Sequence, residues 1–147
     1  LNRKDIWGVT VMSDSTSNLK GAGIYGIGKK NPNLPFHPGV RAGDFIFVSG
    51  QVPKDDNGNM FEGTIEEECR WTIEAIRRVL NADNADLEDL VKVTVYLEDT
   101  RDFGRYNRAF AEYFPEGILS RTTVEAKAAI NTKIEMDAIA YKPVEAK

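Results

Sequence analysis

A strict alternation near the end of the chain constrains the fold more than any other feature. From Lys133 to Tyr141 the sequence reads K-I-E-M-D-A-I-A-Y, in which apolar and polar residues alternate almost without a break. This period of two is typical of a β-strand with one buried face. Upstream, residues 120–125 (S-R-T-T-V-E) are rich in β-branched side chains, which favour a second strand. We therefore predict two strands joined by a short turn, with Asn131 and Thr132 in the polar connection.

Two residues of this stretch have side chains that could take part in binding or catalysis. Arg121 stands at the entry of the first strand, and Glu135 lies inside the second. A guanidinium group can bind a carboxylate through two parallel hydrogen bonds, and a glutamate can hold a water molecule and transfer protons. Together they could bind an organic acid and hydrolyse a bond beside its carboxylate. An Arg and a Glu on neighbouring strands can equally form a solvated cross-strand pair, and the pattern alone leaves both interpretations open.

Composition excludes several classes of function. The 147 residues suffice for one domain with a core, and the net charge of -4, without a basic stripe, gives no support for binding nucleic acid. The single cysteine, Cys69, and the single histidine, His37, leave no internal disulfide and make a metal site improbable. We expect a cytoplasmic protein. The apolar stretch Ile6–Met12, predicted as one short strand, is too short to span a bilayer.

The chain divides into an N-terminal extension of uncertain structure, residues 1–33, and a single domain, residues 34–147. Four closely spaced glycines lie in the extension, at positions 21, 23, 26 and 28. A phosphate-binding loop would place such glycines at the opening of a helix. Because Asn31, Pro32 and Pro35 follow and are poor helix formers, we predict a flexible loop instead.

The first part of the domain predicts a hairpin followed by a helix. A strand around Val40, a turn at residues 42–44 and a strand at residues 45–48 form the hairpin, and Ser49 and Gly50 end it where a backbone could approach a ligand. His37, beside the hairpin, is expected to be a loop residue rather than a base. Thr64 and Glu67 form a capping box, after which apolar residues including Cys69 follow the helical period. Cys69 on that stripe is predicted to be buried and unreactive.

The second part predicts a strand, a second helix and then the two strands described above. Leu90–Leu97 alternates, with Val91, Val93, Val95 and Leu97 expected on one face. Residues 99–102 can cap a helix whose aromatic residues recur every three or four positions, at Phe103, Tyr106, Phe110 and Tyr113. This order predicts an α+β fold with both helices on one face of a sheet, and apolar residues on the other face favour an oligomer.

Five segments, in this order, make the chain resemble the Rid family (reactive intermediate deaminases, also called the YjgF family). The resemblance covers about Pro35 to Tyr141. The segments are A-G-D-F-I-F-V-S-G-Q-V-P at 42–53, D-L-V-K-V-T-V-Y-L at 89–97, D-F-G-R-Y-N at 102–107, S-R-T-T-V-E at 120–125 and K-I-E-M-D-A-I-A at 133–140. The resemblance implies a chorismate-mutase-like α+β fold with a mixed sheet, assembled into a homotrimer with three clefts at the subunit interfaces.

The resemblance also implies an activity and a site. Members hydrolyse 2-imino or enamine acids to 2-oxo acids and ammonia, without metal or organic cofactor. Arg121 matches the arginine that holds the substrate carboxylate, and Glu135 matches the acid that orients or activates water. Further pocket positions of the family are matched by Ser49, Gly50, Asn107, Thr123 and Phe36. Phe36 stands where many members carry Tyr, and the segment between Phe114 and Arg121 is shorter than usual, which would change one wall of the cleft.

Several functions remain open at this point. The first is a general imine and enamine deaminase that removes reactive metabolites, and a variant is a dedicated deaminase of a larger intermediate such as 2-aminomuconate. A different class is a regulator that binds a small carboxylate without turning it over. A nuclease or translation inhibitor is a further alternative, and the acidic composition argues against it.

Overall fold

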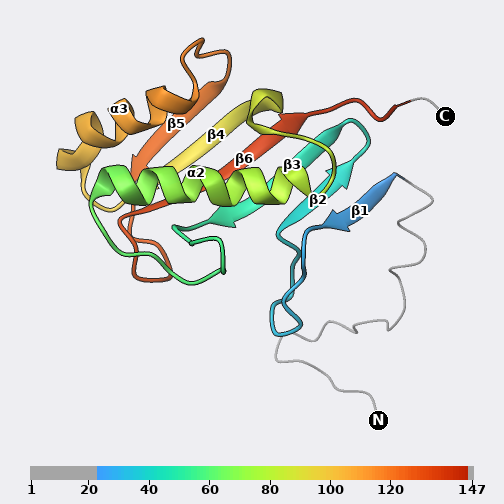
Figure 1. Cartoon of the computed structure of the whole chain (residues 1–147), viewed down its shortest axis with the longest axis horizontal. Helices are drawn as coiled ribbons and strands as arrows, with labels where there is room; N and C mark the ends of the chain where they lie inside the picture. Colours follow the sequence, from blue (N-terminus) through green and yellow to red (C-terminus); the bar gives the residue numbers. More distant parts are fainter. Residues whose placement is uncertain (1–22, 146–147) are drawn as a thin grey trace, which may run out of the picture.

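The computed structural model describes residues 23–145, which form one six-stranded sheet and two α-helices (Figure 1). Both helices lie on the same face of the sheet, so the predicted α+β arrangement is confirmed. In chain order the elements are β1 (Ile24–Ile27), β2 (Gly39–Ala42), β3 (Phe45–Gln51), α2 (Ile65–Asn81), the 3₁₀ turn η1 (Leu87–Asp89), β4 (Leu90–Leu97), the 3₁₀ turn η2 (Thr100–Asp102), α3 (Phe103–Tyr113), β5 (Ser120–Glu125) and β6 (Ile134–Tyr141).

The sheet is mixed, with strand order β1-β2-β3-β6-β4-β5. β4 and β5 are parallel because α3 connects them as a crossover, and the other pairs are antiparallel. The predicted pairing of the last two strands across a short turn is therefore wrong, since β4 lies between β5 and β6. Alternation identifies a strand, but it does not say which strand lies beside it.

Helix α2 begins and packs as the sequence predicts, whereas Asp102, the N-cap residue of α3, makes no side-chain capping hydrogen bond. The backbone N–H of Glu67 donates to Thr64 Oγ1 at 3.2 Å, and the Thr64 N–H donates to Glu67 Oε2 at 2.8 Å, which completes the capping box. The apolar stripe of α2 is buried against the sheet. Two arginines join α3 to α2 through paired hydrogen bonds, Arg70 to Glu112 and Arg105 to Glu66. No helix within residues 23–145 combines the length and apolar character needed to cross a bilayer.

One residue of β4 departs from the predicted face. Val93, Val95 and Leu97 are buried as expected, but Val91 is 41% exposed. The register shifts here, because Leu90 pairs with Ala140 and Lys92 pairs with Ile139. Val91 is thus the extra residue of a β-bulge, which removes it from the buried face.

β1 overturns the loop prediction for part of the glycine-rich stretch. Residues Ile24–Ile27 pair with β2, so the sheet begins inside the range assigned to the N-terminal extension. A Cβ on Gly26 would lie 2.2 Å from Cδ2 of His37, so the His37 ring packs directly on this glycine. The histidine is a packing residue of the loop before β2, as predicted. The strand predicted at residues 6–12 lies outside the described residues.

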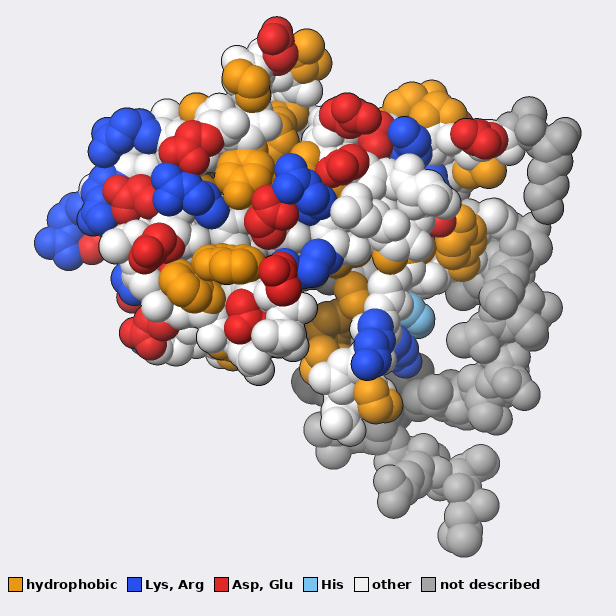
Figure 2. All heavy atoms as spheres, in the orientation of Figure 1, with side chains coloured by type: hydrophobic (Ala, Val, Ile, Leu, Met, Phe, Trp, Pro, Cys, Tyr) orange, Lys and Arg blue, Asp and Glu red, His pale blue; other side chains and the backbone are white. Residues whose placement is uncertain are grey.

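The two faces of the sheet differ in character. On the helix side, acidic and basic side chains are interspersed over α2 and α3 (Figure 2). The opposite face, which no helix covers, exposes large apolar side chains on its middle strands, namely Phe45, Phe47 and Tyr141, with the less exposed Ile139 beside them. We call this surface the open face. It is an apolar area of the kind that another protein surface covers.

Candidate functional site

Arg121 is held on the helix side of the sheet edge. It lies on β5 opposite Val93, whose side chain is buried under the helices. Its Nη2 donates to Oδ1 of Asn107 on α3 at 2.7 Å. The guanidinium carbon lies 4.7 Å from the ring centre of Phe110, and the rings of Tyr106 and Phe103 follow at 5.2 and 5.9 Å. Ring faces at these distances attract a cation, so α3 holds the guanidinium in one place.

Thr123 belongs to the same group. It lies two residues beyond Arg121 on β5, opposite the buried Val95, and its hydroxyl forms a hydrogen bond with that of Tyr106. Burial raises the pKa of the Tyr106 hydroxyl, which therefore stays neutral. Three of the predicted site positions, Arg121, Asn107 and Thr123, thus come together, and we call them the Arg121 cluster. The three aromatic rings were predicted only as the apolar face of the helix.

Glu135 lies on the open face, against β3. It is opposite Tyr96 of β4, and a Cβ on Gly50 would lie 2.2 Å from its Oε1. The register of β3 shifts between Val48 and Gln51, so Ser49 and Gly50 occupy a bulge where the two strands part. The glycine leaves the space into which the carboxylate extends. Sequence alone predicted a close approach at Gly50, but not which group approaches.

Ser49 lies on β3 and Phe36 lies on the loop before β2. The Ser49 hydroxyl donates to the backbone oxygen of His37 at 2.8 Å, which ties β3 to the loop that carries Phe36. The Phe36 ring is exposed, and it does not line the hollow beside Glu135. The predicted positions therefore separate into one group around Arg121 and a second of Glu135 and Gly50, with Ser49 and Phe36 outside the lining of the hollow.

A hollow of about 300 Å³ opens beside Glu135, and we call it the Glu135 hollow. It is lined by Gly50, Tyr96, Glu135, Asp137 and residues 126–129. The Tyr96 hydroxyl donates to Asp137 Oδ2 at 2.8 Å. Burial raises the pKa of Glu135, and the negative charge of Asp137 raises it further. A raised pKa makes the ionised carboxylate a stronger proton acceptor, which suits a group that accepts a proton and later returns it. Sequence reasoning missed Tyr96 and Asp137, although their alternation placed both on the face of Glu135.

Arg121 and Glu135 face opposite sides of the sheet. Arg121 shares its face with the buried Val93, whereas Glu135 shares its face with Tyr96, and β4 separates the two residues. The solvated cross-strand pair is therefore excluded. For the same reason, one small molecule cannot contact both side chains of a single chain.

Cys69 behaves as predicted. It is fully buried on α2, with Sγ 3.7 Å from the backbone oxygen of Tyr106, and burial raises the pKa of its thiol to about 12. A thiol of this kind is not a nucleophile at neutral pH. Within residues 23–145, no three side chains of His, Cys, Asp or Glu converge in a way that could hold a metal ion.

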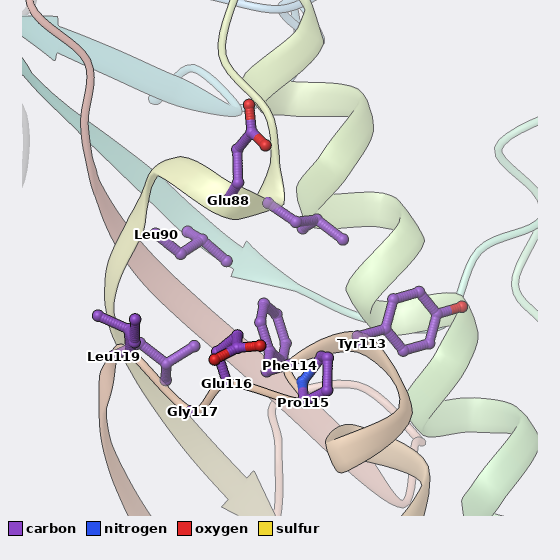
Figure 3. A pocket seen from close by; sticks show the side chains of 10 residues that line it. Glu88, Leu90, Tyr113, Phe114, Pro115, Glu116, Gly117 and Leu119 are labelled. Carbon is purple, nitrogen blue, oxygen red and sulfur yellow. The ribbon is translucent and has the colours of Figure 1, made fainter.

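A second, apolar pocket of about 310 Å³ lies at the other end of β5 (Figure 3). It is lined by Leu87, Glu88 and Leu90 on one side and by residues 113–119 on the other. The segment after Phe114, which the resemblance implies is one wall of the cleft between subunits, lines this pocket within the chain, and neither Arg121 nor Glu135 does. Phe114 connects this apolar pocket to the surroundings of Arg121. The centre of its ring lies 4.7 Å from that of Phe110, the ring that faces the guanidinium.

Comparison with known sequences decides the family. The family model described as "Endoribonuclease L-PSP" matches residues 28–142. The chain belongs to this family. It is the YjgF/RutC family, so the resemblance to Rid proteins is confirmed. A RutC family protein of Pyrococcus abyssi is 43% identical over 113 residues, which are 76% of this chain and 89% of that protein. The mitochondrial protein mmf2 of Schizosaccharomyces pombe is 41% identical over 110 residues, 72% of this chain and 86% of its own.

Solved structures of the YjgF/RutC family share the fold. The YjgF gene product of E. coli superposes with a TM-score of 0.71 at 27% identity, over 80% of this chain and 98% of that one. The E. coli protein TdcF, whose crystal structure contains bound serine, has a TM-score of 0.71 at 25% identity, with the same two coverages. The predicted chorismate-mutase-like fold is thus confirmed.

Proposed function

We propose that this YjgF/RutC family protein hydrolyses 2-imino and enamine acids to 2-oxo acids and ammonia, at sites formed between copies of the chain. One observation carries the proposal. A guanidinium held by rings and an amide lies on one face of the sheet, and a carboxyl group of raised pKa lies on the other. Each is half of a site that binds a carboxylate and activates water beside it.

The chemistry follows from these two groups. The Arg121 fork binds the substrate carboxylate through two parallel hydrogen bonds and so fixes the adjacent imine carbon, which is electrophilic when its nitrogen is protonated. Glu135 accepts a proton from water as the water oxygen forms its bond to that carbon. It then returns the proton to the nitrogen. The C–N bond then breaks as Glu135 removes the proton of the new hydroxyl group, so that ammonia leaves and the carbonyl group of the 2-oxo acid forms.

A homotrimer would bring the two halves together. We propose that Arg121 of one copy faces Glu135 of the next, in a head-to-tail contact that closes after three copies. The exposed apolar rings of Phe45, Phe47 and Tyr141 on the open face support such an assembly, because water would otherwise contact them. The trimer therefore has three equivalent clefts.

The bound serine of TdcF supports a site for a small amino or imino acid in this chain as well. The same observation favours a second candidate, a regulator that binds a small carboxylate without converting it. A dedicated deaminase of a larger, 2-aminomuconate-like substrate would use the same two residues. The family takes its name from an endoribonuclease, but a net charge of -4 opposes contact with RNA phosphates.

The test couples an amino-acid oxidase to the purified protein and follows the decay of the imine. We expect acceleration by the wild type, loss of turnover in Arg121→Ala with the trimer intact by light scattering, and unchanged rates in Arg101→Ala. Arg101 is the matched control, because its side chain is 88% exposed and pairs with Asp99, and it is not among the residues that line the Glu135 hollow. Binding of a 2-oxo acid without acceleration would support the regulator. Wild-type rates in Arg121→Ala would refute the carboxylate assignment.

We also propose a cytoplasmic location, which the single cysteine and the absence of a disulfide support. The name of mmf2 shows that relatives can be mitochondrial. Cell fractionation that recovers the protein with organelles would contradict this proposal.

A further inference from the structure

We propose that Tyr96 and Asp137 form a hydrogen-bonded pair that holds a negative charge beside Glu135 and so adjusts its proton transfer. The inference deepens the proposed function and rests on it, because it concerns the same carboxyl group. It assigns a role to two residues that neither the sequence nor the comparisons single out. Both would be positioning residues that act through Glu135.

The geometry comes from three neighbouring positions of the sheet. Glu135 and Asp137 are two residues apart on β6, so their side chains leave the same face about 7 Å apart along the strand. Tyr96 lies directly opposite Glu135 on β4, and its hydroxyl donates to Asp137 Oδ2 at 2.8 Å. The three side chains all line the Glu135 hollow. The tyrosine thus spans the space beside Glu135 and holds the second carboxylate.

This hydrogen bond has an electrostatic consequence. A free Asp137 could rotate toward solvent, where its charge would be screened, but Tyr96 keeps the carboxylate at the wall of the hollow. There the carboxylate of Asp137 disfavours a second negative charge on Glu135. Burial is the larger cause of the raised pKa of Glu135, and the charge of Asp137 is the smaller one. The hydrogen bond and the negative charge also raise the pKa of Tyr96, so the tyrosine stays protonated and remains a donor.

The other groups that face Glu135 do not duplicate this role. Residues 126–129 contribute one charged side chain to the hollow, Lys127, whose positive charge acts in the opposite sense to Asp137. β3 contributes Gly50, which has no side chain, and β4 contributes Tyr96. Asp137 is therefore the one negative group besides Glu135 in the lining of the hollow.

The experiment compares pH profiles of kcat in the full-length protein. In Asp137→Asn we expect the acid limb of the profile, where Glu135 loses its proton, to move to lower pH by about 0.5 to 1.5 pH units. This size corresponds to the interaction of two charges about 7 Å apart, at effective dielectric constants between those of water and a protein surface. KM should stay within twofold, because Arg121 binds the substrate. In Tyr96→Phe we expect a smaller shift in the same direction, since Asp137 is released but keeps its charge.

Asp56→Asn is the matched control. It makes the same change of charge at a side chain that is 87% exposed and pairs with Arg78, far from β6 in sequence, and it should leave the profile unchanged. A merely structural tie between β4 and β6 would lower the melting temperature of Asp137→Asn without moving the acid limb. A profile of Asp137→Asn that superimposes on the wild type therefore overturns the inference.

A second measurement separates this inference from the proposed function. Carbon-13 NMR of labelled glutamate side chains follows the Glu135 titration directly, with Glu135→Gln identifying its signal. We expect a lower titration midpoint in Asp137→Asn than in the wild type. An unchanged midpoint overturns the inference whatever the enzyme does, whereas absent imine hydrolysis by the wild type refutes only the proposed function.

Discussion

The carboxylate of Glu135 occupies the space in which any side chain at position 50 would have to lie. A Cβ on Gly50 would approach Glu135 Oε1 to 2.2 Å, and the next nearest contacts are also atoms of Glu135. Position 50 therefore determines where this carboxylate can rest. The obstacle is the end of a flexible side chain rather than backbone, so the fold can accommodate a methyl group by moving Glu135.

Gly50→Ala should damage catalysis more than stability. Displacement of a reacting group by about 1 Å can reduce the rate by about 100-fold, so we expect kcat to fall at least tenfold. The melting temperature should change little, since only one side chain must move. Gly104→Ala is the control, because its new methyl group would meet nothing closer than 3.8 Å. Equal kcat values for the Gly50 and Gly104 variants would show that the placement of Glu135 does not matter.

Arg121→Lys tests whether the fork or only the charge is needed. A lysine keeps the charge but loses the parallel hydrogen bonds and the flat contact with the Phe110 ring. We expect the dissociation constant for a 2-oxo acid to rise at least tenfold, measured by calorimetry, with the oligomeric state unchanged. Arg101→Lys, on the exposed η2 turn, should bind as the wild type does. If Arg121→Lys bound with wild-type affinity, a point charge would suffice.

Secondary structure could be predicted because its causes are local. The Thr64 capping box starts α2, and the alternation after Lys133 identifies β6, through contacts between residues close in sequence. The bulges at Val91 and at Ser49 and Gly50 depend on the partner strand, so no local sequence pattern predicts them. β1 was not predicted because its segment is rich in glycine, which does not favour a strand, and the strand forms by pairing with β2.

The site could be predicted as a set of residues but not as an arrangement. The five-segment resemblance selected Arg121 and Glu135, yet their faces depend on the register of β5 and β6 against β4. A change of one residue in either register would turn the side chain to the other face. Tyr96 and Asp137 are 41 residues apart in the sequence, and neither segment by itself predicts that the two side chains form a hydrogen bond.

The raised pKa of Glu135 predicts how stability depends on pH. Because the folded state holds this proton more tightly than the unfolded chain, the carboxyl group costs no stability at pH 4 and lowers it as the pH rises through the folded pKa. Glu135→Gln should therefore stabilise the protein at pH 7 more than at pH 4. The difference in melting temperature between variant and wild type at the two pH values measures this. A gain that is larger at pH 4 would mean that the pKa is lowered instead.

Glu68 should be essential to the start of β6. It is 1% exposed on α2, and its carboxylate accepts hydrogen bonds from the backbone N–H of Lys133 at 2.9 Å and of Gly63 at 3.3 Å. The Lys133 ammonium and the Thr132 hydroxyl also donate to it, at 3.2 and 3.3 Å. Glu68→Ala leaves the two backbone N–H groups without this acceptor, at about 1–3 kcal/mol for each buried group, whereas the Thr132 hydroxyl can still donate to the Ile134 backbone oxygen at 2.9 Å. We therefore expect the free energy of unfolding to fall by about 2 kcal/mol or more.

Urea unfolding measures this loss against two references. Glu68→Gln keeps one oxygen as an acceptor and should recover part of the stability. Glu112→Ala removes a half-exposed carboxylate that pairs with Arg70, and pairs of that kind contribute about 1 kcal/mol or less. Because residues 132 and 133 lead directly into Glu135, Glu68→Ala should also lower kcat at temperatures where it is fully folded. Equal losses of stability in Glu68→Ala and Glu112→Ala would show that the buried carboxylate does not anchor β6.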